Sequence, residues 1–231
     1  RQRPACPRIA MVLQLLPLLP ALLLAAAPAY AENTQAAVPR AFRTQSAATA
    51  DACLAEVEKL MRDTDTLQAR FQMQKKAPGI KRLLVSRGRV VVSPGRGLIW
   101  KVDFPYEALS VFGPGKIGRT DEAGNYSVRE APQAAQAIEV ASRFDRAAMA
   151  RDFFISCTKK DARLMAVLTP KNSTYANFLS EAVVELDAAK GVLTRLSLSQ
   201  PSGAVSHISF SEQTKSLRPS GNDGELLQSV Q

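Results

Sequence analysis

Apolar and polar residues alternate strictly along residues 66–75 of the chain. Glutamine or arginine separates the apolar members, which are Leu67, Ala69, Phe71 and Met73. Successive side chains of a strand point to opposite faces, so this segment predicts a strand with one buried and one solvated face.

Further strands are predicted where short apolar runs lie between prolines and glycines. These runs cover residues 83–92, 96–102, 108–112, 153–158, 164–169, 182–187, 193–199 and 205–210. Residues 115–129 carry few large apolar groups and fit no element, whereas residues 172–178 fit one short helical turn.

Two segments have apolar residues at helical spacing, residues 49–63 and residues 132–150. The second segment has Ile138 and Phe144 on its apolar side, and most of its other apolar residues are alanines. The order helix, strands, helix, strands predicts a mainly β (α+β) fold, with one antiparallel sheet and helices against one side.

The first 31 residues have the pattern of a secretory signal peptide. Three arginines precede an apolar run over residues 11–27, and the small-x-small sequence Ala29-Tyr30-Ala31 follows it. The run is shorter than the ~20 residues of a membrane-spanning helix and contains two prolines. We therefore expect cleavage after Ala31 and export to the periplasm, with translation starting at Met11 and residues 1–10 upstream of the true start.

The remaining organisation follows from composition. Residues 32–48 are polar and lack periodicity, which predicts a disordered leader. Residues 49–217 form the one expected domain, and residues 218–231 are predicted to be a flexible tail.

Charge and cysteine content narrow the possible partners. The formal net charge is +9, and without the three leader arginines it becomes +6, from 27 basic and 21 acidic residues. A modest basic excess suits anionic lipid surfaces or acidic partners, and export argues against nucleic acid. Cys53 and Cys157 remain after cleavage, and an oxidising compartment favours a disulfide between them; two buried thiols are the alternative.

The sequence offers little for catalysis. His207 is its only histidine, and neither a Gly-x-Ser-x-Gly elbow nor a set of spaced zinc ligands is present. The glycine-rich turns at residues 94–97 and 113–115 precede no predicted helix, so they do not predict phosphate-binding loops. We expect a protein that is not an enzyme and that uses no cofactor and no metal.

Four fragments in order resemble the LolA family of periplasmic lipoprotein carriers. They are the Phe-x-Gln strand at residues 66–75, the Gly-Arg-x-x-x-Trp strand at residues 95–100 with Pro105 after it, Leu-Thr-Pro-Lys at residues 168–171, and the closing strands up to Phe210. The resemblance covers the chain from about Cys53 to Phe210. It implies an open antiparallel half-barrel with helices over its mouth.

The chain departs from the family pattern at two places. Ser93 stands where the family has the arginine that latches its helical lid, so Arg96 is the remaining candidate for a lid or latch residue. The aromatic pair expected after Lys116 is also missing. These departures suggest a divergent paralogue, and some LolA-like relatives serve export of polyene lipids or glycolipids.

The resemblance implies a monomeric carrier for the acyl chains of lipoproteins or other lipids. An inner-membrane release complex and an outer-membrane acceptor would be its partners. The residues expected to line its cavity are Leu67, Phe71, Met73, Leu98, Trp100, Phe112, Ile138 and Phe144. Two other interpretations stay open: an envelope module that binds a protein partner, and a lipid hydrolase that would have to use His207.

Overall fold

The computed structural model describes residues 51–56, 58, 66–131, 146–216, 218–219 and 221–231. The predicted signal peptide and leader lie outside these residues, as do Ile138 and Phe144. The strands are β1 (Thr66–Lys76), β2 (Leu84–Ser93), β3 (Gly97–Phe104), β4 (Ala108–Phe112), β5 (Lys116–Thr120), β6 (Tyr126–Glu130), β7 (Phe153–Lys160), β8 (Arg163–Pro170), β9 (Glu181–Asp187), β10 (Val192–Ser199) and β11 (Val205–Ser216).

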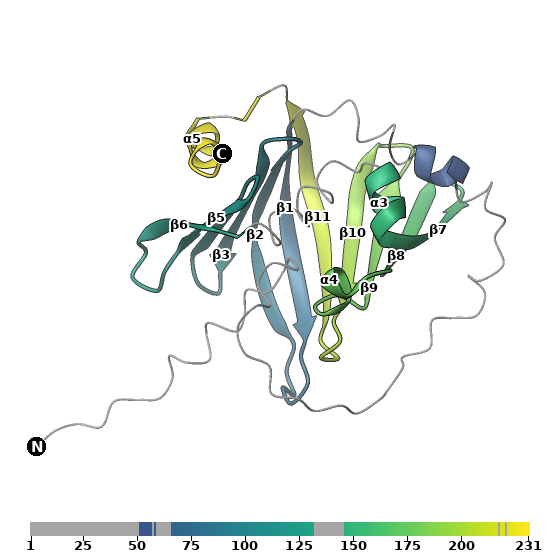
Figure 1. The fold of residues 1–231 in the computed structure, drawn as a ribbon, viewed down its shortest axis with the longest axis horizontal. Helices are drawn as coiled ribbons and strands as arrows, with labels where there is room; N and C mark the ends of the chain where they lie inside the picture. Colours follow the sequence, from purple (N-terminus) through teal and green to yellow (C-terminus); the bar gives the residue numbers. More distant parts are fainter. Residues whose placement is uncertain (1–50, 57, 59–65, 132–145, 217, 220) are drawn as a thin grey trace, which may run out of the picture.

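All eleven strands belong to one antiparallel sheet. Their order is β6-β5-β4-β3-β2-β1-β11-β10-β9-β8-β7, so β6 and β7 are its two edges and the sheet is open. Figure 1 shows the strands side by side, with the first and last strands of the chain at the middle of the sheet. The predicted open antiparallel sheet is confirmed.

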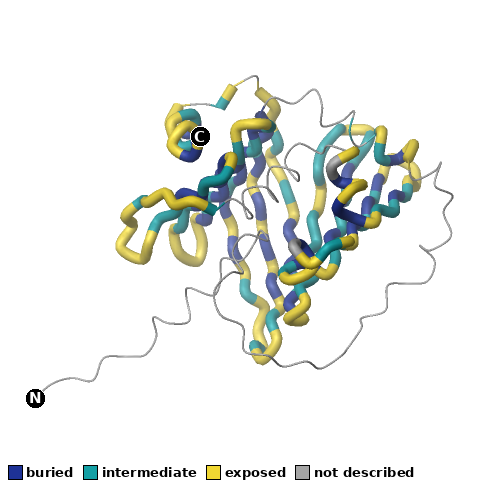
Figure 2. The backbone as a smooth tube through the Cα atoms, in the orientation of Figure 1, coloured by how far each residue is buried: buried dark blue, intermediate teal, exposed yellow. Residues whose placement is uncertain are grey.

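The two faces of the sheet differ in what they bury. We call the face that carries Phe71 the inner face and the opposite one the outer face. The inner face holds two clusters of buried apolar side chains, one on β1–β5 and β11 and one on β7–β9, whereas the outer face holds a smaller cluster on β2–β4. Figure 2 shows the buried positions running along the central strands.

Short helices cover the C-terminal half of the inner face. They comprise helical residues 51–56 and α3 (Arg146–Asp152), with α4 (Ser173–Ala176) in the β8–β9 connection. Met149 of α3 and Tyr175 of α4 are buried in the same cluster as Cys53. Helices were predicted at both 49–63 and 132–150, and the described parts of those segments are helical.

The prediction of a flexible tail over residues 218–231 is wrong for half of that length. Residues 222–228 form α5 (Asn222–Gln228), which buries Leu227 against Val91 and Ile99 on the outer face. The Asp223 carboxylate accepts two hydrogen bonds of 2.7 Å from the Arg89 guanidinium. A segment that is polar in sequence is therefore held in place by two buried apolar side chains, Leu227 and Val230, and one bidentate ion pair.

The segment 115–129, which fitted no element, forms strands β5 and β6. Ile117 is the one large apolar residue of β5 and is 1% exposed. Gly118 brings β5 close to Tyr126, because a Cβ at residue 118 would lie 1.8 Å from the Tyr126 hydroxyl oxygen. β5 pairs with β4 and β6 pairs with β5, so these strands are defined by pairing and not by an apolar pattern of their own.

Candidate functional site

The alternation along β1 places its apolar residues on the inner face. Phe71 and Met73 are 3% and 2% exposed, and the Phe71 ring stacks on Trp100 of β3 with centroids 4.0 Å apart. Stacked aromatic rings in a buried cluster contribute beyond the apolar area they remove from water. Two of the predicted cavity residues are thus in direct contact.

Strand register brings three others together. Leu67 pairs with Val92, Val92 with Leu98, and Leu98 with Phe112, so Leu67, Leu98 and Phe112 lie in one row across four strands. All three are buried. The six predicted cavity residues that the structure describes therefore share the inner face.

The C-terminal half of this face was missed by the sequence analysis. Its buried strand residues are Leu164, Ala166 and Leu168 of β8 with Ala182, Val184 and Leu186 of β9. Burial alternates along both strands, but their sequences contain runs of consecutive apolar residues, so the sequence did not indicate which residues face inward. Leu196 and Leu198 of β10 pack against both clusters, so the apolar inner face is continuous from β5 to β7.

Cys53 and Cys157 form a disulfide. Their Cα atoms lie 5.7 Å apart across a sequence separation of 104 residues. The bond joins the helical residues 51–56 to the edge strand β7, and both cysteines are buried in the C-terminal cluster. This helix is therefore fixed covalently to the sheet.

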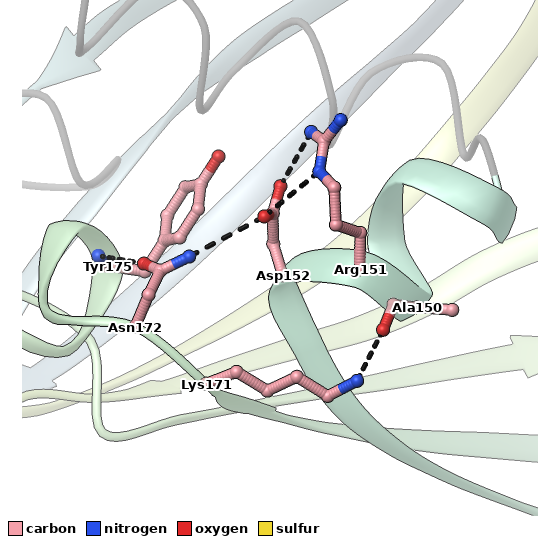
Figure 3. A network of polar contacts seen from close by, with 6 residues as sticks. All are labelled: Ala150, Arg151, Asp152, Lys171, Asn172 and Tyr175. Atoms are coloured by element: carbon pink, nitrogen blue, oxygen red, sulfur yellow. Dashed lines mark hydrogen bonds and ion pairs between the residues drawn. The ribbon is translucent and has the colours of Figure 1, made fainter.

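A polar network fastens the C-terminal end of α3 to the connection between β8 and β9. Asp152 accepts hydrogen bonds from Arg151 at 3.2 and 3.0 Å and from Asn172 at 3.5 Å, and the Lys171 ammonium donates to the Ala150 carbonyl, as Figure 3 shows. Burial raises the pKa of the Tyr175 phenol beside this network, and the Asp152 charge raises it further. The network holds only the end of α3 that leads into β7.

The apolar inner face also contains buried polar atoms. Ser86 Oγ, Trp100 Nε1, Ser110 Oγ and two nitrogens of Arg119 have no hydrogen-bond partner in the part of the chain that the structure describes. Lys75 lies on the same side of β1 and is 5% exposed, and burial lowers the pKa of its ammonium group. Polar groups of this kind are costly in an apolar core, so they mark places where a ligand can supply the missing partner.

Arg96, the predicted latch residue, is exposed in the turn between β2 and β3. Its carbonyl accepts a hydrogen bond of 2.6 Å from the Gln231 side chain at the C-terminus. The described residues include no acceptor for its guanidinium, so its role as a latch stays a prediction.

Other kinds of site find no support in the described residues. They contain no group of three or more histidine, cysteine or acidic side chains that could hold a metal ion. None of their helices is both long enough and apolar enough to cross a bilayer. A groove of about 600 Å³ lies at the turn between β7 and β8, and its lining is mainly charged, with Asp161, Arg163, Glu185 and Arg195 among its residues.

No protein-family model matches the chain, and no curated protein sequence matches it. Among solved structures, it is similar to a LolA superfamily protein from Nitrosomonas europaea at 14% identity and a TM-score of 0.43, covering 76% of this chain and 96% of that one. A putative outer membrane lipoprotein-sorting protein domain from Vibrio parahaemolyticus is 12% identical with a TM-score of 0.43, over 78% and 99% of the two chains. Lipoprotein LppX from Mycobacterium tuberculosis is 11% identical with a TM-score of 0.43, over 74% and 98%.

Proposed function

We propose that this chain is an exported lipid carrier that holds acyl chains against its inner face and passes them towards the outer membrane. The observation that supports this most is the continuity of the apolar inner face, since Leu196 and Leu198 join its two clusters. β6 and β7 are the two edges of the sheet and do not pair with each other, so the sheet does not close around its inner face. An acyl chain needs an apolar surface of this kind.

The helices over the C-terminal half of the inner face support reversible binding. Among its described side chains, α3 buries only one large apolar residue, Met149, and a polar network holds its C-terminal end. Each buried methylene of a lipid is worth ~0.8 kcal/mol, so a long chain in a rigid closed pocket would not be released. A thinly seated helix that is fastened at one end is suited to moving aside.

The proposal includes periplasmic location, signal cleavage after Ala31, a monomeric state, and partners that load and unload the cargo at the two membranes. It assigns no catalytic role. His207 accepts or donates a hydrogen bond of 2.9 Å with Ser197, but both residues lie on the outer face, and the next residues in their row are Gln74 and Val183. This pair does not face the apolar surface where a lipid would lie.

Two measurements test the carrier function. Native mass spectrometry of the full chain, purified from the periplasm, should show a bound lipid mass. An environment-sensitive acyl probe should bind the purified protein, and Phe71→Asp should abolish binding because it places an unpaired charge on the inner face. Amino-terminal sequencing of the same material should begin at Glu32.

Phe154→Asp is the matched control. Phe154 is 65% exposed on β7, so the same substitution there should leave probe binding unchanged. The proposal fails if the native protein takes up no acyl probe. It also fails if Phe71→Asp binds as well as Phe154→Asp while circular dichroism shows an intact sheet.

A second candidate function is docking of a protein partner. Four large apolar side chains are exposed near the ends of β2 and β3: Leu83, Val85, Phe104 and Tyr106. Scattered exposed apolar residues are normal, but a group of this size is typical of interaction surfaces. If Leu83→Ser with Tyr106→Ser stopped function in cells while acyl-probe binding was unchanged, this surface would be the one that matters.

A further inference from the structure

Three polar side chains form one row across the inner face. Trp100 of β3 pairs with Ser110 of β4, and Ser110 pairs with Arg119 of β5. Neighbouring strands lie about 4.8 Å apart, so the Cα atoms of Trp100 and Arg119 are separated by about two strand spacings. Directly paired residues have their side chains on the same face of a sheet. The row therefore brings three hydrogen-bonding groups to one place on an otherwise apolar surface.

Every unsatisfied atom of this row can donate a hydrogen bond. Trp100 Nε1 and the Arg119 Nε and Nη2 atoms are donors only, and Ser110 Oγ can donate or accept. Trp100 and Ser110 are 5% and 1% exposed, and the structure gives none of these atoms a partner among the residues it describes. The row is thus short of an acceptor, and buried donors without one destabilise the folded chain.

The electrostatic environment of the row is positive. Burial lowers the pKa of the Arg119 guanidinium, and the charge of Arg129 lowers it further. Arg129 pairs with Ile117, which places it in the next row of the same face. No carboxylate in the described part of the chain forms an ion pair with Arg119.

We propose that the Trp100–Ser110–Arg119 row binds the anionic head of an acylated ligand, through the oxygens of a phosphate or a carboxylate. This rests on the proposed carrier function and adds the chemical class of the cargo. Arginine binds both groups through two parallel N–H donors, and the two other side chains add donors beside it. The acyl chain would extend towards β1 over Val102 and Phe71, which lie in the neighbouring row of the inner face.

The geometry also sets the direction of the ligand. Arg119 is on β5, one strand from the open edge at β6, whereas Phe71 is on β1 near the middle of the sheet. The charged head therefore sits near the edge, where water is closest, and the acyl chain follows the apolar rows inward. This order minimises the length of the path along which a charged group has to leave water.

The test is competition for a bound acyl fluorophore by three ligands that carry the same acyl chain. They are a fatty acid anion, a lysophosphatidic acid and a neutral monoacylglycerol. The full chain should bind one or both anions more tightly than the neutral ligand, by about ten- to a hundredfold, as expected for hydrogen bonds to a charged group. The two anions distinguish a carboxylate head from a phosphate head.

Arg119→Met should remove this preference and leave binding of the neutral ligand intact. Arg119→Lys keeps the charge without the planar fork, so it should retain part of the preference. The control is Arg87→Met, because Arg87 is an exposed arginine on the outer face, where it stacks over Phe104. This substitution should change none of the three affinities.

The outcomes separate the two proposals. Binding of all three ligands without preference in the native chain, or an unchanged preference in Arg119→Met, would overturn the head-group site and leave the carrier function standing. Failure of every ligand to displace the fluorophore, in a chain that melts cooperatively, would overturn the carrier function and the site with it. Arg119→Met removes a half-buried guanidinium, two nitrogens of which have no partner among the described residues, so we expect it to fold at least as stably as the native chain.

Discussion

Leu227→Ala should destabilise the protein although the residue lies only four positions before the last residue of the sequence. Leu227 is 2% exposed and packs on the outer face with Val91, Ile99 and Val111, each of which is 0% exposed. Truncating a buried leucine to alanine costs about 2–5 kcal/mol. The helix α5 has seven residues, too few to be stable in water, so its structure depends on its contacts with the sheet, of which Leu227 is one.

The single tryptophan supplies the assay. Trp100 is buried on the inner face, away from α5, so its fluorescence reports unfolding of the sheet and not detachment of the tail. In urea, Leu227→Ala should unfold at a clearly lower midpoint than the native chain. Gly113→Ala should also lower the urea midpoint. It changes the sheet side of the same interface, because a Cβ at residue 113 would lie 2.4 Å from the Val230 carbonyl oxygen.

Gln228→Ala is the control, since Gln228 is exposed on the same helix. It should unfold at the native midpoint. If Leu227→Ala and Gln228→Ala had the same midpoint, α5 would contribute nothing to the stability of the sheet, and the reasoning from burial would be refuted.

Three further predictions concern other parts of the molecule. Replacing both Cys53 and Cys157 by serine should lower the unfolding free energy by at most about 4.7 kcal/mol, the chain-entropy value for a loop of about 100 residues. The melting temperature should fall more than the acyl-probe affinity. Equal stability of the native chain and the double variant would argue against the bond. Lys75→Met should raise the urea midpoint near pH 7 and raise it less as the pH approaches 10. Burial lowers the pKa of Lys75 below its ordinary 10.5, so the cost of burying the charged ammonium disappears as the pH rises from the lowered pKa to 10.5. A gain in midpoint that did not depend on pH would contradict this. Asp152→Ala should speed amide hydrogen exchange in α3 more than in β8, and uniform acceleration in both would show that the network does not act locally.

The predictable part of the fold was the part whose pattern is local. Strand β4 was predicted with the bounds Ala108–Phe112 that the structure has, and the start of β1 at Thr66 was also predicted. In both strands, apolar residues on one face and turn residues at the ends are enough to define the element. Strand β5 and helix α5 were missed for the opposite reason, because their apolar content is low and their structure comes from contact with distant segments.

The candidate site likewise contains residues whose inward orientation was predictable and residues whose placement was not. The sequence indicated that Phe71, Trp100 and Phe112 face inward, because each belongs to an apolar or aromatic strand. It did not indicate that Ser110 and Arg119 lie beside Trp100. That arrangement depends on the register between three strands, and β5 had not been predicted at all. A polar residue on a missed strand gives no sign in the sequence of which face it occupies.

The central position of β1 and β11 governs how the sheet can be assembled. Thr66 pairs with Ser216, so the seam between the two halves of the sheet closes only after the chain as far as residue 216 is available to pair. Until then β1, a long alternating strand, has one unpaired edge and is exposed to wrong pairing. The cost of closing a loop grows with its length, and a bond between Cys53 and Cys157 shortens the path from Thr66 to Ser216 by about half. We therefore expect oxidation of Cys53 and Cys157 to speed the final strand pairing, and a chain kept reduced to aggregate or be degraded before its seam closes.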